Sequence, residues 1–190
     1  MLIGSESMEN YQKQMKILAE KLTRIILNFL GISKEESEWV GSSGSNGAVQ
    51  LNYYPQCPEP NRAMGLAPHT DTSLLTILHQ SQIEGLQIFK DQLGWVTVRP
   101  DPHALVVNAG DFLHIISNAR FHCVLHRVIV NRLQHRYSVA YFYSPPLDYV
   151  LTSSLPLGDE QARFRGVTVK EYIEIKAKDL GKALSLINAN

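Results

Sequence analysis

The chain has 190 residues, of which 44% are apolar, and this length and composition suffice to bury one hydrophobic core. Its 18 basic and 18 acidic residues cancel, which gives no reason to expect nucleic acid or an anionic membrane surface as a partner and favours a small molecule. The only two cysteines, Cys57 and Cys123, lack a metal-type pairing and indicate free thiols in a reducing compartment. No secretory leader and no apolar run of about 18 residues is evident. We therefore expect a soluble, cytoplasmic monomer.

The first quarter of the chain is predicted to be a helix followed by a loop. From Met8 to Leu30 apolar residues recur every three or four positions with charges between them, which indicates an amphipathic helix, and Gly31 would cap it. The stretch "GSSGSNG", 41–47, is typical of a loop. Residues 1–47 are therefore assigned to a helical segment and a Gly/Ser loop.

Residues 48–150 are predicted to form a β-rich core. Val49, Leu51 and Tyr53 alternate as in a strand, and further short β-like runs follow between Gly, Pro, Asp and Asn residues. These runs are "LLTILHQ", "GLQIF", "WVTV", "ALVVNAG", "FLHIIS", "CVLHRVIV" and "YSVAYFY". Gly110 and Asp111 would make a turn between two of them. Closely spaced strands without helical patterns between them predict a sandwich, barrel or jelly roll.

Residues 151–190 are predicted to be a helical extension that packs on this core. Helical spacing returns in "TVKEYIEIKAKDLGKALSLI", where Thr168 is the expected N-cap and Glu171 would complete a capping box. The apolar residues available for burial there are Tyr172, Ile173, Ile175, Leu180, Leu184 and Ile187.

Two histidines and one aspartate form a candidate metal site. In "APHTDTS", His69 and Asp71 stand two positions apart and would share one face of a strand, although such a pair alone is more often a surface feature. His126 lies among valines in "VLHRVIV", an unfavourable place for an imidazole without a partner. Two histidines and a carboxylate hold non-haem Fe(II) with positions left open, while zinc accepts the same donors.

A second candidate site follows His126 by ten positions. In "RYSVAYF", Arg136 and Ser138 share one face of a strand, and a guanidinium with a neighbouring hydroxyl can bind a carboxylate. The plainer interpretation is an arginine that pairs with a surface acid. The remaining histidines are expected at the surface or hydrogen-bonded in the core, except that His122 shares the face of His126 and could touch a substrate.

The motifs "LNYYPQCPEP", "HTD", "LHR" and "RYS", in this order, resemble those of the plant 2-oxoglutarate- and Fe(II)-dependent dioxygenases. Within that family, "RAMGLAPHTDTSLLTILHQ", "GLQIFKDQLGWVTVRP", "LVVNAGDFLHIISN" and "VLHRVIVN" are similar to the gibberellin 3-beta-dioxygenase branch. The similarity runs from about Val49 to Asn188. Members of the family carry a substantial N-terminal region ahead of the first helix expected here, so this chain resembles a shortened member of uncertain activity.

The resemblance implies a double-stranded β-helix, or cupin-like jelly roll, mainly β with flanking helices. It implies that His69, Asp71 and His126 bind Fe(II) and that Arg136 and Ser138 bind the distal carboxylate of 2-oxoglutarate. It further implies the roles of two residues in "NYYP": Asn52 and Tyr54 would reach the metal-chelating end of 2-oxoglutarate, and Tyr53, on the opposite face, would be core.

The activity implied by the resemblance is hydroxylation of a gibberellin-like diterpenoid acid at the 3-beta position. O2 and 2-oxoglutarate would be converted to succinate and CO2, and ascorbate would support the reaction. Two alternatives stay open at this point. One is a related dioxygenase that acts on a flavonoid or another plant metabolite, and the other is an inactive jelly-roll binding protein.

Overall fold

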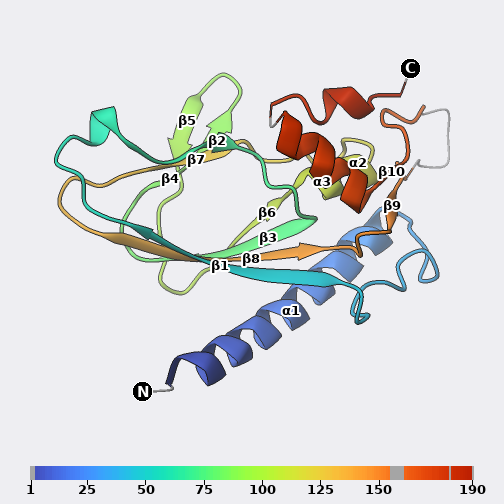
Figure 1. Ribbon diagram of the computed structural model, residues 1–190, viewed down its shortest axis with the longest axis horizontal. Helices are drawn as coiled ribbons and strands as arrows, with labels where there is room; N and C mark the ends of the chain where they lie inside the picture. The colour runs from blue at the N-terminus through green and yellow to red at the C-terminus, as the bar shows by residue number, and fades with distance from the viewer. Residues whose placement is uncertain (1–2, 155–160, 180, 190) are drawn as a thin grey trace.

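Two four-stranded antiparallel sheets form the centre of the protein (Figure 1). The structure is a computed structural model that describes residues 3–154, 161–179 and 181–189. The first sheet has the order β1 (Asn46–Tyr54), β8 (Arg136–Ser144), β3 (Leu75–Gln80), β6 (Val106–Ala109). The second has the order β2 (Met64–His69), β7 (His126–Ile129), β4 (Leu86–Lys90), β5 (Gly94–Thr97). Apart from the hairpin of β4 and β5, neighbouring strands come from distant parts of the chain, and the predicted jelly roll is confirmed.

Strand β8 shows how the sequence alternation builds the core. It pairs with β1 along all nine residues, from Asn46 opposite Ser144 to Tyr54 opposite Arg136. The side chains of Tyr141 and Tyr143 are fully buried on one face of the sheet, whereas Arg136 points to the other face, toward the second sheet. Because successive side chains of a strand point to opposite faces of the sheet, alternate residues of β8 face the hydrophobic core and an interior cavity.

Helix α1 (Ile3–Phe29) covers the outer face of the first sheet (Figure 1). Its buried residues Ala19 and Leu27 belong to the same apolar cluster as Tyr141 and Tyr143. The helix begins five residues before the predicted start, and Gly31 follows it with a positive φ of 76°, as the expected C-cap requires. No helix in the described part of the chain is long and apolar enough to cross a membrane.

Helix α2 (Asp111–Ile116) corrects the prediction for "FLHIIS", which is helical and not a strand. Phe112, Leu113, Ile115 and Ile116 are all buried, so the run shows neither helical nor strand periodicity. The predicted turn at Gly110 and Asp111 is also wrong, because Gly110 is the N-cap of this helix.

The C-terminal segment contains β9 (Val150–Leu151), β10 (Val167–Thr168), α3 (Val169–Lys178) and the 3-10 turn η2 (Ser185–Ile187). Another 3-10 turn, η1 (Pro60–Arg62), precedes β2. The hydroxyl of Thr168 accepts a hydrogen bond from the Glu171 backbone N–H at 3.1 Å, which confirms the N-cap, while the Glu171 carboxylate bonds Arg165. Tyr172 and Ile187 are buried as expected, and Leu180 lies outside the described residues. The division of the chain at 47/48 and 150/151 stays a prediction.

The prediction that Tyr53 belongs to the core is wrong. Its side chain is 54% exposed, stacks on Tyr137 with 5.0 Å between ring centroids, and contacts His135 Nδ1 through its hydroxyl at 2.9 Å. Tyr54, the next residue, is the buried one. The outer face of β1 is thus open to solvent at this end, while the inner face is enclosed.

Candidate metal centre and carboxylate site

A bulge between β2 and β7 brings the imidazole rings of two histidines close together. Leu66 pairs with Val128 and the next pair is His69 with His126, so β2 contains one more residue than β7 between these pairs. The two imidazole centroids are 4.2 Å apart. His69 ends β2 and Asp71 lies just beyond it, so the expectation that both occupy one strand is wrong, although both reach the same space.

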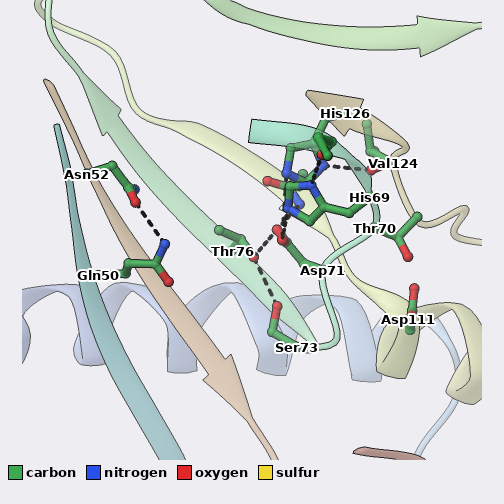
Figure 2. A network of polar contacts seen from close by, with 12 residues as sticks. Gln50, Asn52, His69, Thr70, Asp71, Ser73, Thr76, Asp111, Val124 and His126 are labelled. Atoms are coloured by element: carbon green, nitrogen blue, oxygen red, sulfur yellow. Dashed lines mark hydrogen bonds and ion pairs between the residues drawn. The ribbon is translucent and has the colours of Figure 1, made fainter. Parts of the chain in front are cut away.

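The three predicted ligand residues converge on one point (Figure 2). One ligand atom from each of His69, Asp71 and His126 lies within 4.8 Å of the others. The Nδ1 of His69 donates to the Ala67 carbonyl at 2.8 Å, and that of His126 to the Val124 carbonyl at 2.9 Å. Because a carbonyl only accepts, the Nε2 atom of each neutral imidazole carries the lone pair, and each Nε2 lies 3.6–3.7 Å from Asp71 Oδ1. This donor set fits a divalent transition metal.

The Asp71 carboxylate is oriented by two residues that the sequence analysis missed. Thr76 Oγ1 and Asn108 Nδ2 both donate to Asp71 Oδ2, at 2.6 and 3.0 Å, which leaves Oδ1 facing the histidines. Thr76 lies on the inner strand β3 and Asn108 on the edge strand β6, as polar interruptions of the apolar runs "LLTILHQ" and "ALVVNAG". These interruptions were the available signal for a supporting role.

The electrostatics keep the carboxylate ionised. Burial alone would raise the pKa of Asp71, but His69, His126 and the hydrogen bonds from Thr76 and Asn108 hold it well below its ordinary value. The Asp71 carboxylate raises the pKa of His69, against the opposing effect of burial. Burial lowers the pKa of His126. Asp71 and His126 therefore offer lone pairs to a metal ion readily, whereas at His69 the metal ion competes with a proton.

Arg136 is a buried cation that faces the interior of the barrel. Its side chain is 1% exposed, its Nη2 donates to Gln80 Oε1 at 2.8 Å and its Nη1 lies 3.5 Å from Ser138 Oγ. Within the described residues no carboxylate forms an ion pair with this guanidinium, and its Nε has no hydrogen-bond partner. A buried charge of this kind favours an anionic ligand. The plainer interpretation of Arg136, pairing with a surface acid, is wrong.

The other two predicted residues lie beside Arg136 and Ser138. Asn52 Nδ2 is 3.4 Å from Ser138 Oγ, and its Oδ1 accepts a hydrogen bond from Gln50 Nε2 at 2.8 Å (Figure 2). The guanidinium of Arg136 lies 5.2 Å from the centroid of the Tyr54 ring. The expected role of Asn52 and Tyr54 at the metal-chelating end of 2-oxoglutarate stays a prediction.

A cavity of about 700 Å³ joins the two sites. Its lining includes the metal-ligand candidates and Arg136, and most of its wall is apolar. Apolar residues of the wall include Leu78, Ile88, Val106, Val124, Phe142 and Ile173. His122 is not among the residues that line the cavity and is exposed beside His114, so its contact with a substrate stays a prediction. The arrangement can hold a small, mainly apolar molecule against a metal ion and a bound carboxylate.

Comparison with known protein families gives one match over the core of the chain. Residues 45–145 match the model of the 2OG-Fe(II) oxygenase superfamily. The chain is 50% identical over 185 residues to gibberellin 3-beta-dioxygenase 1 of Arabidopsis thaliana, covering 94% of this chain and 52% of that protein. It is 47% identical over 183 residues to gibberellin 3-beta-dioxygenase 1 of Pisum sativum, covering 93% and 49%. The chain thus spans about half the length of these relatives.

Solved structures with the same fold also match most of the chain. The crystal structure of JOX2 in complex with 2OG, Fe and JA superposes with a TM-score of 0.86 at 32% identity, covering 97% of this chain and 56% of that one. The crystal structure of the dioxygenase for auxin oxidation in rice gives a TM-score of 0.84 at 26% identity, covering 97% and 63%.

Proposed function

Because the chain belongs to the 2OG-Fe(II) oxygenase superfamily, we propose that the protein is a 2-oxoglutarate- and Fe(II)-dependent dioxygenase that hydroxylates a gibberellin at the 3-beta position. The observation that carries the proposal is the convergence of His69, Asp71 and His126 in the same cavity as the buried cation Arg136. One set suits a metal ion and the other suits the distal carboxylate of a cosubstrate.

The residues divide the work of the reaction between them. His69, Asp71 and His126 would hold Fe(II), which, when bound, supplies the activation of O2 that accompanies conversion of 2-oxoglutarate to succinate and CO2. Arg136 and Ser138 bind the distal carboxylate through charge-assisted hydrogen bonds and so fix the cosubstrate relative to the metal. Ascorbate would support activity by keeping iron reduced.

The apolar part of the cavity supports a hydrophobic organic substrate. Its volume, about 700 Å³ in all, falls in the range of small-molecule sites, and its wall excludes water from the reacting carbon. Identities of 41–50% to several gibberellin 3-beta-dioxygenases support a gibberellin-like diterpenoid acid as that substrate.

Four further points belong to the proposal. The protein acts as a monomer in the cytoplasm, and it has neither nucleic acid nor a membrane as a partner. The balance of 18 basic and 18 acidic residues supports the last two points.

The test begins with anaerobic titration of the Fe(II)-loaded protein with 2-oxoglutarate. We expect a visible metal-to-ligand charge-transfer band that is absent from a His69→Ala variant and retained in a His79→Ala control, since His79 is exposed and lies outside the cavity. Aerobic incubation with a panel of gibberellins and flavonoids, followed by mass spectrometry, then identifies the substrate.

The outcomes separate the alternatives. A 3-beta-hydroxylated gibberellin supports the proposal. Turnover of a flavonoid alone would indicate a related dioxygenase of different specificity. Folded protein that gives no charge-transfer band would indicate a jelly-roll binding protein without catalytic iron.

A further inference from the structure

The peptide between two of the metal-ligand candidates is held by a lysine from the C-terminal helix. Lys176 of α3 donates from Nζ to the Thr70 carbonyl at 2.8 Å and to Thr70 Oγ1 at 3.1 Å. Thr70 lies between His69 and Asp71 in the sequence, so this contact acts on the backbone that carries both. The lysine is 4% exposed, which makes it an internal residue and not a surface charge.

The third proton of the Lys176 ammonium group also has an acceptor within the protein. Its Nζ donates to Asp111 Oδ2, which accepts a further hydrogen bond from the Tyr172 hydroxyl at 2.8 Å. An ammonium group has three protons, and all three have acceptors within the protein. Although Lys176 lies at the cavity wall, it therefore has no donor left for a substrate carboxylate.

Asp111 itself is attached to the metal-ligand segment. It is the first residue of α2, and its backbone N–H donates to the Asp71 carbonyl at 2.8 Å. Lys176 of α3 and Asp111 of α2 thus donate hydrogen bonds to two consecutive carbonyls, those of Thr70 and Asp71 respectively. Figure 2 shows Thr70 beside the triad and Asp111 on the same side, farther from it.

We propose that Lys176 is a positioning residue for the metal centre: with Asp111 it fixes the Thr70–Asp71 backbone so that His69 and Asp71 present their ligand atoms together. The inference rests on the proposed function in that it takes the triad as the metal site. It adds that α3, which supplies no metal-ligand candidate, sets the metal affinity. A ligand orientation that is fixed before binding lowers the cost of binding the ion.

The experiment compares metal affinity with stability in the whole chain. Co(II) serves as the probe because it resists oxidation better than Fe(II). Calorimetry gives its dissociation constant, and the visible d–d spectrum reports its coordination geometry. We expect Lys176→Met to weaken Co(II) binding by about 10- to 100-fold and to change the spectrum. The matched control is Lys178→Met on the exposed side of the same helix, for which wild-type affinity is expected.

Tyr172→Phe distinguishes positioning from general stability. It removes one hydrogen bond to Asp111 but leaves the contacts from Lys176 to Thr70, so it should lower the melting temperature without weakening Co(II) binding. If Lys176→Met alone fails to fold because Asp111 is left as a buried uncompensated charge, the double variant Lys176→Met/Asp111→Asn removes that charge. It still lacks the donor to Thr70, so its Co(II) affinity should remain low.

Wild-type Co(II) affinity and spectrum in a folded Lys176→Met or double variant would overturn the positioning role. Equal losses of affinity in Tyr172→Phe and Lys176→Met would also overturn it, because affinity would then simply follow stability. If the wild-type chain binds Co(II) but its Fe(II)-loaded form hydroxylates no gibberellin, only the proposed function would be overturned.

Discussion

At the scale of single residues, the two oxygens of the Asp71 carboxylate have different tasks. Oδ2 accepts hydrogen bonds from Thr76 and Asn108, and Oδ1 faces His69 and His126. A carboxylate held in this way offers one oxygen to a metal ion and cannot rotate to chelate it with both. Such supporting contacts tune a metal site nearly as strongly as the ligands themselves.

Thr76→Val should test this division, because it keeps the shape of the side chain and removes the 2.6 Å hydrogen bond to Asp71. We expect Co(II) affinity to fall by about 10-fold or more as the carboxylate gains freedom. Calorimetric titration gives the affinity, and Thr97→Val in β5 of the other sheet is the matched control. Unchanged affinity in Thr76→Val would contradict the orienting role.

The pH dependence of metal binding should be governed by His69. The Asp71 carboxylate raises the pKa of His69 in the metal-free protein, so a proton occupies this imidazole at higher pH than usual and the metal must displace it. Affinity for Co(II) should therefore fall as the pH drops through that raised pKa, by about tenfold per unit below it. Titrations in buffers of different ionisation enthalpy count the released proton. Affinity that is independent of pH would contradict this assignment, and exposed His79 replaced by Gln should leave the dependence intact.

The residues proposed to carry the chemistry could be predicted from the sequence, whereas the direction in which their supports face could not. His69, Asp71, His126, Arg136 and Ser138 belong to motifs with a recognisable donor set, and the structure brings them to one cavity. The supports Gln80, Thr76 and Lys176 have side chains that are just as common on solvent-facing surfaces. Only the pairing of strands and the docking of α3 reveal which way they face.

At the scale of elements, α2 shows where sequence periodicity fails. A short apolar run that is buried on every side has no polar face to reveal its period, so "FLHIIS" could not be assigned from pattern alone. The long helix α1 and the strands were predictable because each has one face against the core and the other in solvent or lining the cavity. The N-terminus of α2 also has a task that the pattern did not show: the N–H groups of Gly110, Asp111 and Phe112 bond the carbonyls of Leu74, Asp71 and Ser73.

Gly110→Ala should disturb the contact between the N-terminus of α2 and the backbone of residues 71–74. A Cβ at this position would lie 2.0 Å from the Ser73 carbonyl oxygen and 2.9 Å from that of Asp71, so the backbone must shift. We expect a loss of about 1–3 kcal/mol in the free energy of unfolding, measured by chemical denaturation of the metal-free protein. In the control Gly166→Ala the nearest atoms are 3.7 Å away, and the change should stay within about 0.5 kcal/mol. Equal stability of the two variants would refute the close approach.

At the scale of the whole molecule, each sheet supplies one half of the site. The two histidines come from β2 and β7 of one sheet, and Arg136 and Ser138 come from β8 of the other. A dicarboxylate that chelates the metal and reaches Arg136 would bridge the two sheets. Ligands should therefore stabilise the protein in two separable steps.

Thermal melts should show these steps. Co(II) alone should raise the melting temperature, and 2-oxoglutarate added to the Co(II) form should raise it again. At 100 times its dissociation constant each ligand adds about 2.7 kcal/mol to the free energy of unfolding. Arg136→Met should abolish the second step and keep the first. Arg127→Met, which removes an arginine stacked on Trp95 outside the cavity, should keep both. A second step that survives in Arg136→Met would place the carboxylate elsewhere.

The alternation along β8 separates the residues that a substrate would touch from those that hold the fold. Ala140, Phe142 and Ser144 line the cavity, while Tyr141 and Tyr143 are fully buried in the core beneath α1. Changes in the first set can reshape the cavity while the second set keeps the sheet attached to its helix. Selection, or an enzyme engineer, can thus retune specificity through alternate positions of one strand with little cost in stability, whereas inserting a single residue would exchange the two sets at once.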